Sequence, residues 1–122
     1  MSSVFYVFIG GGLGSVARFL LASFVQRALP GAFPFGTLTV NCIGCCVIGM
    51  LWGISGKGAP GFPLSVFLFA GVLGGFTTFS SFGLETFALI HDGAWPLAAV
   101  YVLLTNLLGL LLTFAGYTLM VR

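Results

Sequence analysis

The sequence predicts an all-α integral membrane protein with four transmembrane helices, and two observations carry this prediction. Of its 122 residues, 59% are hydrophobic and only 5% are charged, whereas a globular domain has roughly 25% charged residues. The apolar residues fall into four segments, each near or above the ~20 residues that span a bilayer. Short breaks rich in glycine and proline separate them. We therefore expect one transmembrane domain over residues 1–122.

The first expected span covers residues 4–29. We interpret it as a span and not as a secretory signal, because it is long, lacks a preceding basic segment and contains Arg18. It holds a small-residue surface for close helix packing, made of Gly10, Gly11, Gly12 and Gly14. Arg18 is costly at that depth, so it either faces a water-filled vestibule and attracts anions there or only anchors the helix.

The second expected span covers residues 37–55 and opens with Thr37 and Asn41. These two side chains are four residues apart, so they share one helical face. Asn41 brings two amide donors to a place where donors are scarce. It can donate to an anion or bond to a neighbouring helix, and the second role is the usual one for a membrane asparagine.

The third expected span, residues 62–90, contains a polar run from Gly74 to Glu85 that is unusual for a lipid-facing helix. The pair Gly74-Gly75 weakens a helix. Hydroxyl side chains follow that can bond to freed backbone groups or cap a second half-helix; they belong to Thr77, Thr78, Ser80 and Ser81. We predict a helix broken mid-membrane, where carbonyls of one half can bind a cation and amides of the other an anion.

Phe76, Phe79 and Phe82 recur every three residues in the same run and share a face wherever it is helical. Such a stripe normally packs against helices or lipid. The alternative rests on the ring quadrupole, because the positive edge of a phenyl ring can meet an anion without a competing fixed charge.

The fourth expected span covers residues 97–121. A face with mostly hydroxyl-bearing side chains runs along it at four-residue spacing, formed by Tyr101, Thr105, Gly109 and Thr113. This face is either a polar track or an interhelical contact with hydrogen bonds over a glycine.

The few charges also bear on orientation. With four spans, Lys57 and Arg122 lie on one side of the membrane and Arg27 on the other. The positive-inside rule needs a clear excess on one side. We predict insertion in both orientations and an antiparallel, dual-topology homodimer; a single orientation is the alternative that the charges leave open.

Catalytic and metal-binding functions find little support in the sequence. Cys42, Cys45 and Cys46 have a C-x-x-C-C spacing, but the chain has one histidine, the distant His91, so we interpret them as buried apolar residues. Two carboxylates and one histidine offer no triad, metal cluster or carboxylate pair. We expect no enzymatic activity.

Three motifs together resemble the Fluc/CrcB family of fluoride channels. The run from Gly74 to Glu85 is similar to the family's G-G-x-T-T-F-S-T-F-x-x-E, and the segment Gly36-Thr-Leu-Thr-Val-Asn41 to Gly44 is similar to its G-T-L-x-x-N-x-x-G. The segment from Gly10 to Arg18 resembles its G-G-x-x-G-A-x-x-R, with Ser15 in place of the alanine. The resemblance covers the whole chain, and the motif in the third span is the most specific.

The resemblance implies the residues of two fluoride pores in an antiparallel homodimer. Phe79 and Phe82 correspond to the pair whose ring edges contact fluoride, and Asn41 to a pore-facing donor. Other polar pore positions are matched by Thr37, Ser80, Ser81, Glu85, Tyr101 and Thr105, and the vestibule position by Arg18. Ser81 replaces a threonine but keeps the hydroxyl, whereas Gly109 stands where some relatives carry serine.

The resemblance also implies a structural sodium ion at the dimer interface, bound by the backbone carbonyls of Gly74 and Thr77 from both subunits. The implied function is passive fluoride export across the cell inner membrane, with fluoride, lipid and a second copy as partners and no nucleic acid. One alternative is a small multidrug-resistance exporter, but the first span lacks the carboxylate such an exporter needs. The other is a non-transporting accessory membrane subunit.

Overall fold

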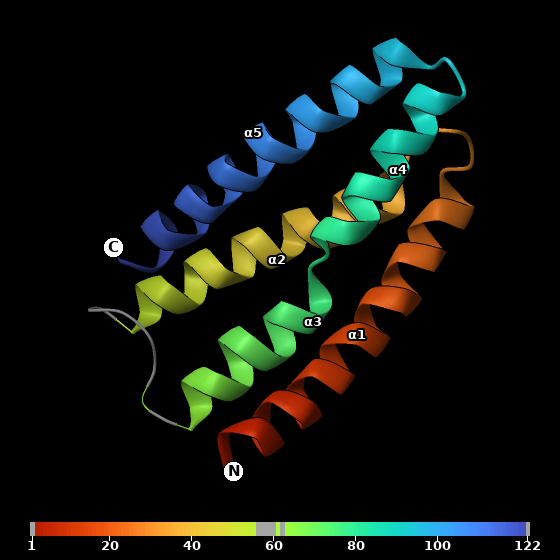
Figure 1. The fold of residues 1–122 in the computed structure, drawn as a ribbon. Coiled ribbons are helices and arrows are strands. Elements are labelled where there is room, and N and C mark those ends of the chain that lie inside the picture. The colour runs from red at the N-terminus through yellow and green to blue at the C-terminus, as the bar shows by residue number, and fades with distance from the viewer. Residues whose placement is uncertain (1, 56–60, 62, 122) are drawn as a thin grey trace.

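The structure, a computed structural model, describes residues 2–55, 61 and 63–121 (Figure 1). All regular secondary structure within these residues is helical, with four segments long and apolar enough to cross a membrane. The first two are α1 (Ser2–Ala28) and α2 (Phe35–Ile54), and the last is α5 (Trp95–Met120). The third consists of the π-helix η1 (Val66–Leu73), the short α3 (Gly74–Phe76) and α4 (Phe79–His91).

The helix ends differ from the expected bounds by a few residues. α2 and α5 begin two residues earlier than expected, at Phe35 and Trp95. Pro96 lies in the first turn of α5, where its missing N–H has no helical acceptor to lose. The expected start of the third span at Phe62 lies outside the described residues. So do Lys57 and Arg122, two of the charges behind the orientation prediction.

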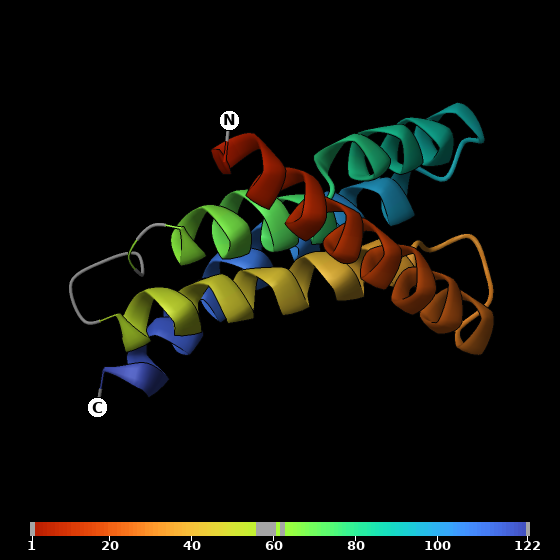
Figure 2. The ribbon, with the colours of Figure 1, turned by 90° about the horizontal axis from the view of Figure 1, so that it is seen from below.

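The four spans form two neighbouring pairs. α1 packs along η1 and α3, while α5 packs along α2, which also contacts α1 (Figure 1). α4 does not continue along the axis of α3, and it contacts α5. Seen from below, α4 and the C-terminal half of α1 diverge at the end of the molecule that carries the loops after α1 and α4 (Figure 2). The two termini lie toward the opposite end.

Glycines bring the helices of each pair into close contact. In the first pair, a Cβ on Gly10 would lie 2.6 Å from the carbonyl oxygen of Phe67, and one on Gly14 would collide with that of Val72. In the second pair, a Cβ on Gly49 would collide with the carbonyl of Thr113. The predicted small-residue surface of the first span thus packs within the chain, although Gly12 has nothing within 4 Å of its would-be Cβ.

Candidate functional site

The third span contains two residues in an extended conformation. α3 ends at Phe76, and Thr77 and Thr78 follow with φ/ψ of −86°/155° and −146°/119°. α4 then begins at Phe79, with Thr78 as its N-cap: the Thr78 Oγ1 accepts a hydrogen bond from the Ser81 amide at 3.2 Å. Such a cap satisfies one of the free amides at the start of a helix. We call residues 74–78 the break segment.

Asn41 of α2 binds the backbone of this segment with both ends of its amide. The Thr78 N–H donates to Asn41 Oδ1 at 2.8 Å, and Asn41 Nδ2 donates to the Thr78 carbonyl at 3.0 Å. Both groups of an extended residue are thereby satisfied by one side chain. In this chain Asn41 therefore bonds to a neighbouring span and keeps one Nδ2 hydrogen for another acceptor.

Arg18 of α1 reaches the same segment from the other side. Its Nε donates to the carbonyl of Gly75 at 3.1 Å, and its side chain is half-buried. Gly75 lies in the last turn of α3, where carbonyls lack amide partners and carry the negative end of the helix dipole. The hydrogen bond from Arg18 satisfies one of these carbonyls, and the vestibule role of Arg18 stays a prediction.

Other carbonyls of the break segment keep no such donor. The amide of Thr78, four residues after Gly74, donates to Asn41, and the amide of Ser81, four residues after Thr77, donates to Thr78 Oγ1. Among the described residues, nothing donates to the carbonyls of Gly74, Phe76 and Thr77. Unpaired carbonyl oxygens at a helix break are suitable ligands for a hard cation, so the carbonyls of Gly74 and Thr77 fit a sodium ion.

A cavity of about 440 Å³ lies at the break segment, between η1, α3, α2 and α5. Its polar lining comes from residues far apart in the chain, among them Asn41, Thr77, Thr78 and Thr105. The Thr105 Oγ1 is buried and has no hydrogen-bond partner in the part of the chain that the structure describes. A buried hydroxyl without a partner costs free energy, which marks Thr105 as a position where a bound ion or water would be favourable.

The two predicted pore phenylalanines differ sharply in exposure. Phe79 lines the cavity at the break segment and is 82% exposed in the single chain, whereas Phe82 is 9% exposed. Their ring centroids are 5.6 Å apart, and the Phe82 ring meets Tyr101 edge to face at 5.1 Å. Beside them, Ser80 is exposed and its hydroxyl lies 3.4 Å from that of Thr78.

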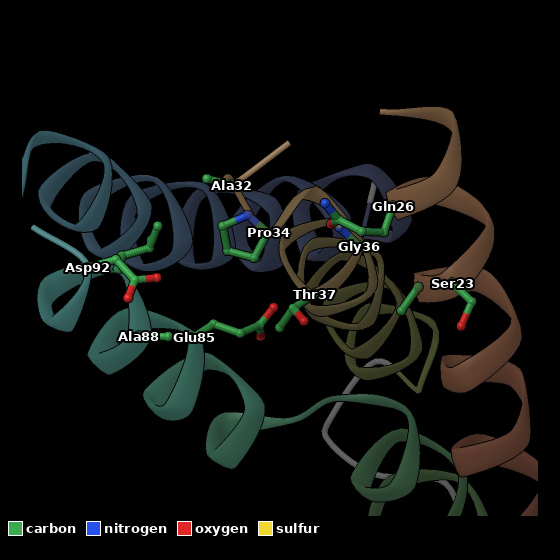
Figure 3. A pocket seen from close by; sticks show the side chains of 11 residues that line it. Ser23, Gln26, Ala32, Pro34, Gly36, Thr37, Glu85, Ala88 and Asp92 are labelled. Carbon is green, nitrogen blue, oxygen red and sulfur yellow. Dashed lines mark hydrogen bonds between the residues drawn. The ribbon is translucent and has the colours of Figure 1, made fainter. Parts of the chain in front are cut away.

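A second cavity, of about 410 Å³, lies between the diverging ends of α1 and α4 (Figure 3). The Glu85 carboxylate points toward Thr37 in this cavity, with Asp92 nearer the loop (Figure 3). Tyr101, fully buried, donates its hydroxyl to Glu85 Oε1 at 3.4 Å. Of the predicted polar positions, Thr37 and Glu85 thus line this cavity, and Asn41 and Thr105 line the one at the break segment. The two cavities meet α2 one turn apart, at Thr37 and Asn41.

Gln26 belongs to the second cavity and was not predicted from the sequence. Its Oε1 accepts a hydrogen bond from the Gly36 amide at 3.0 Å, at the start of α2. Its Nε2 donates to the carbonyl of Phe33 at 3.1 Å. Gln26 therefore holds the loop between α1 and α2 against the end of α1, next to Thr37. No local pattern marks it, because its partners follow a proline-rich turn.

The polar face of α5 packs mainly on α2. The Thr113 hydroxyl donates to the Gly109 carbonyl of its own helix at 2.9 Å, and a Cβ on Gly109 would lie 3.3 Å from Cys45 Sγ. The Thr113 hydroxyl is thus satisfied within α5 and Gly109 packs against α2, whereas the Thr105 hydroxyl on the same face has no bond within the described residues. Cys42, Cys45 and Cys46 are free thiols, and the described residues contain no group of side chains suited to hold a metal ion.

Comparison with known proteins gives consistent matches over nearly the whole chain. Residues 5–117 match the family model "CrcB-like protein, Camphor Resistance (CrcB)". A protein of Methylobacillus flagellatus named fluoride-specific ion channel FluC is 47% identical, covering 98% of this chain and 94% of its own length. Proteins of the same name from Thermus thermophilus and Parabacteroides distasonis are 46% and 44% identical, covering 93% and 95% of this chain and 89% and 91% of their own.

Proposed function

The chain belongs to the CrcB family, and on this premise we propose that it is a fluoride channel, which lets fluoride leave the cell down its gradient. It is a multi-pass protein of the cell inner membrane and not an enzyme. The three relatives described above, of 44–47% identity, are each named fluoride-specific ion channel FluC.

The observation that carries the proposal is the cavity at the break segment. It brings Asn41, Thr77, Thr78 and Thr105 from three spans next to Phe79, inside a chain of 5% charged residues. Donors and ring edges without a fixed positive charge suit an anion that must bind and then leave, because a full charge would hold it too strongly. The unpartnered Thr105 hydroxyl and the second Nδ2 hydrogen of Asn41 are the donors available to it.

The proposed path continues toward the second cavity. Phe82 packs on Phe79 of the first cavity and meets Tyr101 edge to face, and Tyr101 bonds to Glu85 of the second cavity. We assign Thr37, Ser80, Ser81 and Glu85 to this path and Arg18 to its vestibule. A chain of hydroxyls can replace the hydration shell of a small anion step by step.

We also propose that two antiparallel copies form the channel, with two pores and one central sodium ion. In the single chain Phe79 and Gly74 are exposed, and an exposed carbonyl at membrane depth needs a partner. The carbonyls of Gly74 and Thr77 from both copies would hold the sodium ion. When bound, this ion supplies a fixed positive charge that offsets the carbonyl dipoles and joins the subunits.

Fluoride efflux from liposomes with purified protein tests the proposal. We expect a fluoride-selective electrode to record rapid fluoride release once an ionophore lets a cation leave with the anion and so prevents a membrane potential from building up. Protein-free liposomes should release none. Chloride release at the same rate would contradict fluoride selectivity. No release of either anion would favour an accessory subunit, and proton-coupled export of an organic cation would favour a multidrug exporter.

A further inference from the structure

We propose that Arg18 is a positioning residue for the cation ligands of the break segment, and that it acts through the hydrogen on Nε and not through its charge. This inference rests on the sodium ion of the proposed function. It gives Arg18 a contact to a backbone carbonyl in addition to its proposed place at the vestibule. The residues that bind the ion remain the carbonyls of the segment itself.

The carbonyls of the break segment differ in whether a side chain donates a hydrogen bond to them. Gly75 accepts from Arg18 at 3.1 Å, and Thr78 accepts from Asn41 at 3.0 Å. Gly74 and Thr77, the residues just before each of them, receive no donor from the described part of the chain. Side chains from α1 and α2 thus occupy two carbonyls of the break segment, and the carbonyls left free are those of the two expected sodium ligands and of Phe76. Without the Arg18 contact, Gly75 would present another unpaired oxygen beside them.

Arg18 makes this contact through one particular nitrogen of its guanidinium group. The bond comes from Nε, the first nitrogen of the guanidinium, and not from the terminal nitrogens. Nε is fixed by the aliphatic stem of a half-buried side chain, so it defines where the Gly75 carbonyl and the end of α3 lie. Glycine contacts at Gly10, Gly11 and Gly14 pack α1, the helix that carries Arg18, closely against η1 and α3. No carboxylate lies within 4.0 Å of Arg18 among the described residues.

Three substitutions separate the donor from the charge, because their side chains place different atoms where Nε lies. Arg18→Gln puts an amide N–H at that position and removes the charge. Arg18→Lys keeps the charge but puts a methylene group there, with the ammonium one bond further out. Arg18→Met has a side chain that reaches the position of Nε and provides neither donor nor charge there.

The measurement is the thermal unfolding temperature of the purified protein in detergent, followed by the fluorescence of Trp52 and Trp95. Sodium is titrated against N-methylglucamine at constant ionic strength. A cation that binds only the folded state raises this temperature with concentration. The apparent dissociation constant for sodium obtained from this dependence is called the sodium midpoint below. We expect Arg18→Gln to keep the sodium midpoint within about twofold of wild type. Arg18→Lys and Arg18→Met should raise it by about tenfold or more, as expected for an unsatisfied carbonyl.

The opposite pattern, a wild-type midpoint in Arg18→Lys with a loss in Arg18→Gln, would overturn the inference in favour of a charge effect. Equal midpoints in all variants, or equal losses, would also overturn it. If Arg18→Met is not monodisperse, the comparison of glutamine with lysine decides. An absence of any sodium response in wild type would overturn the sodium site and this inference together. Fluoride efflux would still test conduction separately.

Discussion

Among single residues, Thr78 combines the most contacts in the candidate site. Its amide and carbonyl both pair with Asn41, and its hydroxyl caps α4 through the Ser81 amide. Because all three groups are used, the break segment is a defined structure and not a frayed helix end. The partner that makes this possible is an asparagine, which alone offers a donor and an acceptor side by side at this length.

Asn41→Asp tests this pairing. The carboxylate can accept from the Thr78 amide but cannot donate to the Thr78 carbonyl, so we expect a loss of about 1–3 kcal/mol in the free energy of unfolding. Lower pH should restore stability, because a protonated carboxyl regains an O–H donor. Chemical unfolding of the variant and of wild type at several pH values measures this. A penalty that does not change with pH would contradict the reciprocal pairing.

The two phenylalanines should respond differently to the same substitution. Phe82→Ile removes a buried ring from its contact with Tyr101 and should lower the free energy of unfolding by about 1–3 kcal/mol. Phe79→Ile changes a side chain that is 82% exposed in the single chain. It should leave that free energy nearly unchanged and reduce fluoride efflux by up to about tenfold, equivalent to ~1.4 kcal/mol.

Liposome efflux and unfolding curves recorded on the same preparations check both expectations. Phe79→Tyr serves as the control that keeps an aromatic ring at the exposed position. Full efflux in Phe79→Ile would show that this ring only packs.

At the scale of elements, the contact between α1 and the first half of the third span depends on small residues facing each other. Gly10 and Gly14 lie against the backbone of η1, and Gly75 lies against Gly11 with its would-be Cβ 2.5 Å from the Gly11 carbonyl oxygen. Such contacts allow backbones to approach closely and gain van der Waals energy, which is the main attraction between helices in lipid. They also set the distance at which Arg18 meets Gly75.

Gly14→Ala and Gly12→Ala form a matched pair on this helix. The methyl group at Gly14 would collide with the Val72 carbonyl, so we expect a loss of about 1–3 kcal/mol. At Gly12 the would-be Cβ has nothing within 4 Å, and alanine should stabilise the helix by up to ~1 kcal/mol. Unfolding in denaturant measures both. Equal losses in the two variants would point to an effect on assembly and away from this contact.

The sequence was sufficient for the four spans because their apolar length is a local property. It also indicated which residues carry polar groups at membrane depth. It could not indicate which of them pair: Asn41 and Thr78 are 37 residues apart, and Arg18 and Gly75 are 57 apart. These pairs depend on the crossing of helices. The division of Phe79 and Phe82 into exposed and buried rings follows from the same crossing, although both lie on one predicted face.

At the scale of the whole molecule, one chain presents open cavities and an exposed Phe79 along the break segment. The described charges at the loop end, where α1 and α4 diverge, are Arg27, Glu85, Asp92 and, when protonated, His91. They provide no clear excess of basic residues. Insertion in both orientations and pairing with an inverted copy stay predictions, because the rule compares Lys and Arg on both sides and Lys57 and Arg122 lie outside the described residues.

Labelling of a single cysteine tests the orientation. In a background with Cys42, Cys45 and Cys46 replaced by alanine, Ser2→Cys lies at an exposed end of α1. A membrane-impermeant maleimide applied to intact inverted or right-side-out vesicles should label about half of the protein in each, since an antiparallel pair places one copy on either side. Complete labelling in one kind of vesicle and none in the other would establish a single orientation.

The break segment is held in its conformation by hydrogen bonds from α1 and α2 of the same chain. None of these bonds needs a second copy. A newly inserted subunit therefore acquires its bend during its own folding in the bilayer. In the proposed dimer, pairing would then proceed by lateral diffusion and docking of preformed surfaces, without remodelling of the third span. Assembly of such a protein would be governed by the encounter rate of oppositely inserted copies, and so by how evenly the insertion machinery distributes the two orientations.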